Sequence, residues 1–254
     1  MLDRETGATM ADQALKVDAS GLTDVGRVRQ HNEDRYAVMP GVGVYVVADG
    51  MGGHAGGEFA SETVLTEMSD FDAISSLESQ QDRFVAGLSR AHDRMLKLAE
   101  CLEMPAMGTT VAGLLIHQND CAIVWSGDSR VYRLRSDQLT QLNWDHSEAQ
   151  ELLDAGVLTS DQARNWPRRN IITKALGVAD PLEYDVVQQG VEPGDVFLIC
   201  SDGLTEHSTD PEISGILMAA ETAEVACTKL VQQTLDRGAT DNVTVVVVRI
   251  LGDV

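Results

Sequence analysis

Short runs of apolar and β-branched residues recur along this chain, and they constrain the fold more than any other feature of the sequence. Six segments show the pattern: 42–48, 109–116, 121–125, 130–135, 195–201 and 243–250. Turn residues separate several of them, as expected for strands rather than for one long buried segment. Short strands at close spacing with tight turns favour antiparallel sheets.

Two longer segments carry apolar residues at helical spacing. From Phe84 to Leu102 these residues recur in alternating steps of four and three, which places them on one face of a helix. Residues 225–235 show a second such pattern, which stops near Gly238, and a shorter helix is expected after Gly57. Helices that lie between blocks of strands indicate an α+β fold, with sheets packed face to face and helices outside.

The charge balance narrows the classes of partner. The 254 residues include 40 acidic and 19 basic side chains, a net charge of −21. The field of such a surface repels nucleic acid and anionic membranes, so neither is an expected partner. No apolar run approaches the roughly 20 residues of a membrane helix, and the N-terminus lacks the apolar core of a secretory signal. A cytoplasmic location is the expectation. The acidic residues either form a solvated surface or cluster in part to hold cations.

The chain is expected to form one domain. Residues 1–18 lack periodicity and are predicted to be a mobile tail, and 19–254 to be the folded domain. Within it, residues 147–177 are predicted to be an insertion that lies over the surface like a flap. The cysteines form no CxxC pair, so buried free thiols are expected at Cys101, Cys121, Cys200 and Cys227.

Four aspartates lie where predicted strands begin or end. Asp49, Asp128 and Asp202 each follow an apolar run, and Asp241 precedes the last one. Each alone is compatible with turn chemistry, because Asp-Gly is a common turn pair. Four of them, with few basic residues nearby, favour an oxygen-only site for hard cations such as Mg²⁺ or Mn²⁺. No HxH or HExxH pair is present, so a zinc site is not expected.

Other phosphate chemistries lack their sequence patterns. None of the four lysines follows a glycine, so there is no nucleotide P-loop. The kinase motifs and a CxxxxxR phosphatase loop are also absent from the sequence.

Ordered motifs give the sequence a resemblance to a known family. They are GRVRQHNED (26–34), VADGMGGHAG (47–56), MGTT (107–110), GDSR (127–130), WDHS (144–147), RN with ALG (169–177), SDGL (201–204) and TDN (240–242). In this order they resemble the metal-dependent protein phosphatases, the PPM or type 2C family, and its bacterial branch most closely. The resemblance covers about residues 20–250 and implies an αββα sandwich: two packed antiparallel β-sheets flanked by helices.

The resemblance also implies a role for each site residue. Asp49 matches the carboxylate that bridges two metal ions, and Gly50 matches the residue that offers its backbone carbonyl. Asp202 and Asp241 resemble further ligands of one ion. The remaining matches are Glu33 and Asp34, which hold metal-bound waters; Asp128, which forms a third metal site with Asp202; and Arg29, which grips the substrate phosphate.

These roles make one reaction plausible on physical grounds. Two or three Mn²⁺ or Mg²⁺ ions would lower the pKa of a shared water, so that a bridging hydroxide attacks phosphorus directly and no phosphoenzyme forms. Arg29 can bind two phosphate oxygens with its planar fork. The resemblance thus implies a protein serine/threonine phosphatase that acts on phosphoproteins and opposes a cognate serine/threonine kinase in bacterial signalling. A monomer is expected.

Three positions leave alternatives open. Other branches of the family carry a histidine where this chain has Met51, so the general acid is His54 or a metal-bound water, while His54 is equally compatible with a plain helix start. His146 is expected to order the insertion rather than to take part in the chemistry. Trp166 replaces the histidine of the usual His-Pro, and it is either packed or an exposed docking residue.

Two other functions compete with the phosphatase. An inactive relative could serve as a binding module, but it would be expected to lose ligands such as Asp49, Asp202 and Asp241 or the phosphate residue Arg29. A hydrolase of small phosphate esters is the other alternative, and activity on a chromogenic ester would not distinguish it.

Overall fold

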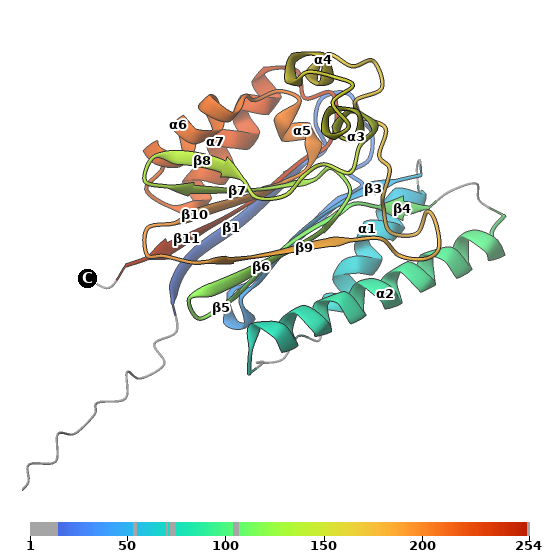
Figure 1. Cartoon of the computed structure of the whole chain (residues 1–254), viewed down its shortest axis with the longest axis horizontal. Helices are drawn as coiled ribbons and strands as arrows, with labels where there is room; N and C mark the ends of the chain where they lie inside the picture. The colour runs from blue at the N-terminus through green and yellow to red at the C-terminus, as the bar shows by residue number, and fades with distance from the viewer. Residues whose placement is uncertain (1–14, 53–54, 70, 72–74, 104–106, 253–254) are drawn as a thin grey trace, which may run out of the picture.

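A computed structural model describes residues 15–52, 55–69, 71, 75–103 and 107–252 of the chain. Its centre is two antiparallel sheets packed face to face (Figure 1). The first sheet has the strand order β1 (Lys16–Asp24), β11 (Val243–Leu251), β10 (Val196–Cys200), β7 (Arg130–Arg135) and β8 (Gln138–Gln141). The second has the order β2 (Asp34–Met39), β3 (Val44–Met51), β5 (Val111–His117), β6 (Asp120–Ser126) and β9 (Asp185–Gly190), with β4 (Gly108–Thr109) paired to β3.

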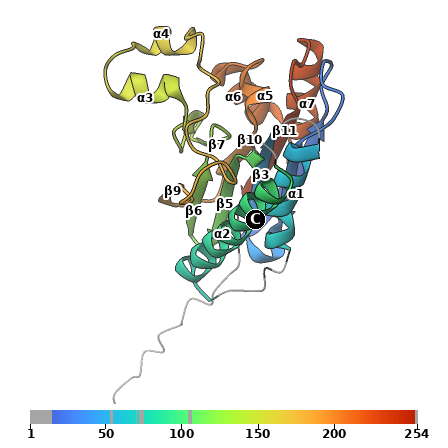
Figure 2. The ribbon, with the colours of Figure 1, turned by 90° about the vertical axis from the view of Figure 1, so that its right-hand side faces the viewer.

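Helices cover the outer face of each sheet. The long helices α1 (Ala55–Met68) and α2 (Leu77–Cys101) lie on the second sheet, and α5 (Asp202–Thr205), α6 (Asp210–Ala219) and α7 (Ala223–Asp236) lie on the first. A short 3₁₀ turn, Pro40–Val42, precedes β3. Two small helices, α3 (Glu148–Asp154) and α4 (Ser160–Arg164), project from one end of the sandwich (Figure 2).

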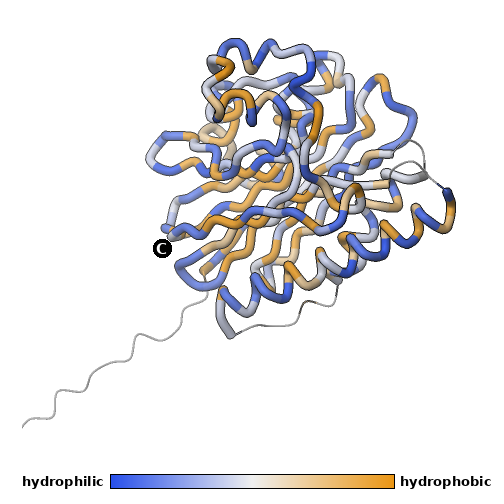
Figure 3. The backbone as a smooth tube through the Cα atoms, turned by 45° about the vertical axis from the view of Figure 1, so that its right-hand side comes forward, coloured by the Kyte–Doolittle hydropathy of each residue, from blue (hydrophilic) through white to orange (hydrophobic). Residues whose placement is uncertain are grey.

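The central strands are apolar on both faces because each sheet is covered on both sides. In β3, Val44 and Val46 pack under the helices, whereas Tyr45 and Val47 face the other sheet. Side chains of a strand alternate between its two faces, so a strand buried on both sides has an almost continuous apolar sequence. The hydrophobic segments accordingly gather in the middle of the molecule (Figure 3).

The α+β prediction is confirmed, and each of the six predicted segments contains a strand. Strands β1, β2, β8 and β9 and helix α6 were not predicted from the sequence. The predicted tail is also too long, because β1 begins at Lys16 and pairs with β11 along its whole length. Cys101 is exposed, although a buried thiol was expected, while the other three cysteines are buried.

Residues 147–177, predicted to be an insertion, contain α3 and α4. Trp166 is half-buried within this segment, and its indole N–H donates to Glu148 Oε1 at 3.0 Å. The second oxygen of Glu148 pairs with Arg168 at 2.8 Å. Trp166 is thus held by a hydrogen bond to α3, while part of its side chain stays exposed.

Among the helices that the structure describes, none has both the length and the apolar character needed to cross a membrane.

Candidate metal centre

Five aspartates come together at one end of the sandwich. The second sheet supplies Asp34, which begins β2, and Asp49, which lies near the end of β3; the two residues are direct partners in the strand register. The first sheet supplies Asp202, two residues beyond β10, and Asp241, two residues before β11. Asp128 lies in the turn between β6 and β7. The carboxylates at these strand ends lie close enough together to affect one another's pKa.

Two hydroxyl groups tie the two sheets together at this site. Ser201 and Thr244 donate to the same oxygen of Asp34, Oδ2, at 2.8 Å and 2.6 Å. The Thr244 N–H also donates to Ser201 Oγ at 3.0 Å. Because Ser201 directly precedes Asp202, this network fixes Asp202 of the first sheet beside Asp34 of the second.

Burial and mutual repulsion dominate the electrostatics of the cluster. Burial raises the pKa of Asp49 well above its usual value, and the charges of Asp34, Asp202, Asp128 and Asp241 raise it further. The pKa of Asp202 is raised in the same way, first by burial and then by Asp128. A group of carboxylates that disfavour one another's charge is stabilised by any cation that enters it.

The pKa values of two further carboxylates in the cluster are raised as well. Burial raises the pKa of Asp34 to about 6, although the hydrogen bonds from Thr244 and Ser201 oppose the change. Burial, followed by the charge of Asp145, raises the pKa of Asp128 to about 7. Asp34 Oδ1 and Asp128 Oδ1 are both enclosed without a hydrogen-bond partner. Orphaned buried oxygens are costly, and a hard cation would satisfy them.

Arg29 is the basic side chain that pairs with the cluster. Its Nη2 lies 2.6 Å from Asp241 Oδ2, and the hydrogen bond to Asp241 raises the pKa of Arg29. The side chains are 55% and 30% exposed, and such surface pairs contribute only about 0–1 kcal/mol. Either partner can therefore be recruited by a stronger ligand at small cost.

Gly50 must be a glycine for steric reasons. A Cβ at this position would collide with the backbone carbonyl of Gly57, which lies in α1, and would approach the carbonyl oxygen of Glu33 to 2.7 Å. The Gly50 N–H donates to that same Glu33 oxygen at 3.2 Å. The close approach holds the end of β3 against both the start of α1 and the loop that carries Glu33.

The donor set fits a hard divalent cation, because it consists of oxygen atoms with excess negative charge. The carboxylate side chains do not, however, all point to one position. In the described part of the chain, no three His, Cys, Asp or Glu side chains are placed closely enough to form a ready-made metal cluster. The aspartates are near enough to raise one another's pKa, and one of them, Asp241, is paired with Arg29.

Asn242 holds the loop beside this site in place, a role that was not predicted from the sequence. Its side-chain oxygen accepts the Glu33 N–H at 2.9 Å, and its Nδ2 donates to the carbonyls of Val25 and His31 at 2.9 Å and 3.0 Å. The loop that carries Arg29 and Glu33 is thus fastened to the segment that carries Asp241. The TDN motif contained the relevant signal, because an asparagine next to a candidate ligand can bond both donors and acceptors of a loop.

His146 is buried and orders the chain, as predicted. Its Nδ1 accepts the Gly127 N–H at 3.1 Å, its Nε2 lies 2.7 Å from Asp185 Oδ2, and its ring stacks on Trp125. The His146 carbonyl accepts the N–H of Thr173, in the insertion, at 2.8 Å. His146 therefore joins the turn before Asp128 to the insertion. The other candidate histidine, His54, lies outside the described residues.

Comparison with known sequences gives consistent results. Residues 26–243 match the sequence model of a family described as "Protein phosphatase 2C". The serine/threonine phosphatase stp of Listeria innocua is 34% identical over 234 residues, which cover 89% of this chain and 93% of that protein. Protein phosphatase PhpP of Streptococcus pneumoniae is 34% identical over 238 residues, with coverage of 91% and 97%.

Solved structures show the same architecture. PppA, described as a key regulatory component of T6SS in Pseudomonas aeruginosa, is 37% identical and superimposes with a TM-score of 0.87 over 93% of this chain and 99% of that one. The catalytic domain of the serine threonine protein phosphatase PstP, in complex with two manganese ions, is 32% identical, with a TM-score of 0.80 and coverage of 93% and 99%.

Proposed function

This chain belongs to the protein phosphatase 2C family, and from that premise we propose that it is a metal-dependent phosphatase that hydrolyses phosphoserine and phosphothreonine on other proteins. The observation that carries the proposal is the grouping of five aspartates from both sheets at one end of the sandwich, with Arg29 paired to one of them. Such a site binds cations and a phosphate group together.

The cations of this site are two or three Mn²⁺ or Mg²⁺ ions. Asp49, Asp202 and Asp241, with the backbone carbonyl of Gly50, are the proposed direct ligands. Glu33 and Asp34 are proposed to hold ordered waters, and Asp128 completes a third position with Asp202. Bound ions of this kind supply hydroxide near neutral pH and offset charge on the phosphoryl oxygens. The manganese ions in the PstP structure support this proposal.

The chain's own residues position the substrate and the ligands. Arg29, on a loop fastened by Asn242, binds two oxygens of the substrate phosphate once it separates from Asp241. Ser201 and Thr244 keep Asp34 oriented and ionisable beside Asp49. His54 remains a candidate for protonating the leaving oxygen of serine or threonine.

The wider role follows from the family. Residues 16–254 form the catalytic domain, and the insertion at 147–177 acts as a flap beside the site. The partners are phosphorylated proteins and a serine/threonine kinase that the enzyme opposes in bacterial signalling. The names of the Listeria and Streptococcus relatives support the substrate class.

A phosphothreonine peptide assay tests the proposal. The wild-type protein is expected to release phosphate with Mn²⁺ and to lose this activity in EDTA. Asp202→Ala is expected to be inactive, while Asp236→Ala, which removes an exposed acid on α7, keeps full activity. Equal activity of the Asp202→Ala variant and the wild type would refute the mechanism. No phosphate release with either metal ion would instead favour an inactive binding module.

A further inference from the structure

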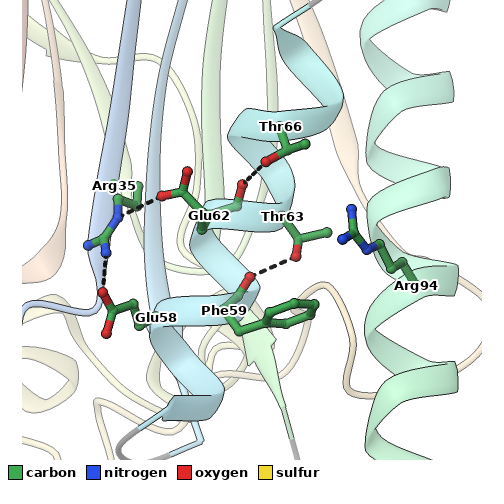
Figure 4. A pocket seen from close by; sticks show the side chains of 7 residues that line it. All are labelled: Arg35, Glu58, Phe59, Glu62, Thr63, Thr66 and Arg94. Atoms are coloured by element: carbon green, nitrogen blue, oxygen red, sulfur yellow. Dashed lines mark hydrogen bonds and ion pairs between the residues drawn. The ribbon is translucent and has the colours of Figure 1, made fainter.

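A shallow groove runs along the outer surface of α1 and α2. We call it the helical groove and define it by Phe59 and Thr63 of α1 and by Arg94, Lys97, Leu98 and Cys101 of α2. It consists of two adjoining hollows of about 410 Å³ and 370 Å³, which share Phe59 and Arg94. Figure 4 shows the first hollow, with Arg94 reaching from α2 towards Phe59 and Thr63.

The floor of the helical groove is apolar. The Phe59 ring lies 5.6 Å from the Arg94 guanidinium, and Leu98 lines the second hollow. The hydroxyl of Thr63 is already engaged, because it donates to the Phe59 carbonyl at 2.7 Å, as Thr66 does to the Glu62 carbonyl at 2.9 Å. The floor therefore offers a ligand mainly carbon surface.

The α2 side of the groove carries positive charge without acidic partners. In the described part of the chain, neither Arg94 nor Lys97 forms an ion pair, and both are exposed. On the opposite wall Arg35 is bound by Glu58 at 2.6 Å and by Glu62 at 2.9 Å. Arg94 and Lys97 thus leave two positive charges side by side at the edge of the apolar floor, in a chain with 40 acidic and 19 basic residues.

We propose that the helical groove docks an acidic segment of a partner protein, with one apolar side chain of that segment against Phe59 and Leu98 and its carboxylates against Arg94 and Lys97. Cations at the edge of an apolar hollow complement this combination. A free inorganic anion would leave the apolar floor unused. A nucleic acid or an anionic membrane would be repelled by a net charge of −21, whereas a short segment contacts only the local charge. Docking here does not depend on the proposed reaction.

Cys101 provides a built-in reporter for this site. It lies in the second hollow, and among the four cysteines it is the exposed one. The full chain would be treated with iodoacetamide, and the rate at which Cys101 is alkylated would be measured by mass spectrometry. The probe is a 12-residue peptide rich in glutamate with one central leucine. We expect the peptide to slow alkylation at least fivefold at saturation, and the same peptide with serine in place of leucine to protect more weakly.

Two charge-reversal variants test whether the peptide binds in the helical groove. Lys97→Glu should lower the affinity for the peptide at least tenfold, judged by protection relative to the same variant without peptide. Lys229→Glu makes the same charge change on the exposed face of α7 and should leave protection unchanged. Equal protection in both variants would overturn the proposal. So would no protection by the peptide at 1 mM, whether or not vesicles of anionic lipid protect Cys101.

Discussion

Strand β10 has an aspartate near each end, and the charges that surround the two carboxylates are opposite in sign. Asp195, just before the strand, has a side chain with no solvent exposure. Arg135 binds both of its oxygens, at 2.6 Å each, and the Glu192 N–H adds a third hydrogen bond at 2.9 Å. Asp202, just beyond the other end, has four acidic neighbours that raise its pKa.

The difference distinguishes a carboxylate whose charge the fold itself satisfies from one for which we propose a bound cation. At Asp195 the chain supplies its own cation, so the charge is satisfied as soon as the protein folds. At Asp202 the chain adds more negative charge instead, which costs stability unless a cation arrives from solution. An unbalanced buried cluster at one end of a strand, with a balanced one at the other, indicates a binding site and not a defect of packing.

The largest expected effect is on catalysis. Asp202→Asn should lower Mn²⁺-dependent phosphate release at least about 1,000-fold, equivalent to about 4 kcal/mol of transition-state stabilisation. Asp195→Asn should leave the rate per folded molecule within about twofold, because Asp195 lies at the far end of the strand. Steady-state kinetics on a phosphothreonine peptide check both, and similar losses in the two variants would remove the distinction.

The second effect is on stability, with the order of the variants reversed. Asp195→Asn should lower the free energy of unfolding by about 3 kcal/mol. This value is at the low end for a broken buried ion pair, because Arg135 still pairs with Glu192 at 2.7 Å in the variant. Asp202→Asn should raise the free energy of unfolding in EDTA, since it removes one charge from a repelling cluster. Urea unfolding with Asp236→Asn as the surface control measures both. A stabilised Asp195→Asn protein would contradict this account.

The third effect comes from the metal itself. Mn²⁺ at 100 times its dissociation constant should stabilise the wild type by about 2.7 kcal/mol. This gain in the free energy of unfolding should be retained in Asp195→Asn. It should disappear in Asp49→Asn, because Asp49 is a proposed metal ligand whose charge is affected by acids of both sheets. Thermal unfolding with and without Mn²⁺ tests this, and an increment that persists in Asp49→Asn would place the cation elsewhere.

The smallest expected effect is on the pH dependence of stability, and it comes from His146, a titratable side chain that is buried in its neutral form. Burial lowers the pKa of His146, although its hydrogen bond to Asp185 opposes this. A histidine whose folded pKa lies below the unfolded value of about 6.5 stabilises the fold fully above pH 6.5 and loses that contribution as the pH falls.

Between pH 7 and pH 5 the wild type should therefore lose about 1 kcal/mol more than His146→Asn. The asparagine oxygen can replace Nδ1 as acceptor for the Gly127 N–H but does not titrate in this range. Urea titrations at both pH values measure the difference. An equal loss in the two proteins would mean that His146 does not contribute.

The sequence predicted the parts of the fold in which one strand or helix carries its own pattern. β10 and β11 are buried on both faces, so their apolar runs were recognisable. β1 (KVDASGLTD) is an edge strand, partly exposed along its length, and its mixed sequence has no such run. Helix α6 was missed although Thr209 and Glu212 form a capping box at its start.

The candidate site was predictable to a similar degree. Asp49, Asp128, Asp202 and Asp241 were identified by their positions at strand ends, whereas the roles of Asp34, Glu33 and Arg29 came from the family resemblance. The pairing of Arg29 with Asp241 could not be foreseen, because 212 residues separate them. For the same reason the sequence does not distinguish Asp195 from Asp202: the arginine that neutralises Asp195 is 60 residues away on another strand.

The place of β11 in the first sheet has a consequence for how the protein is made. This strand lies between β1 and β10, and Asp241 and Asn242 immediately precede it. A nascent chain still on the ribosome, with residues 241–251 not yet released, has neither the centre of its first sheet nor the asparagine that holds the arginine loop. We therefore expect copies terminated before residue 241 to lack phosphatase activity.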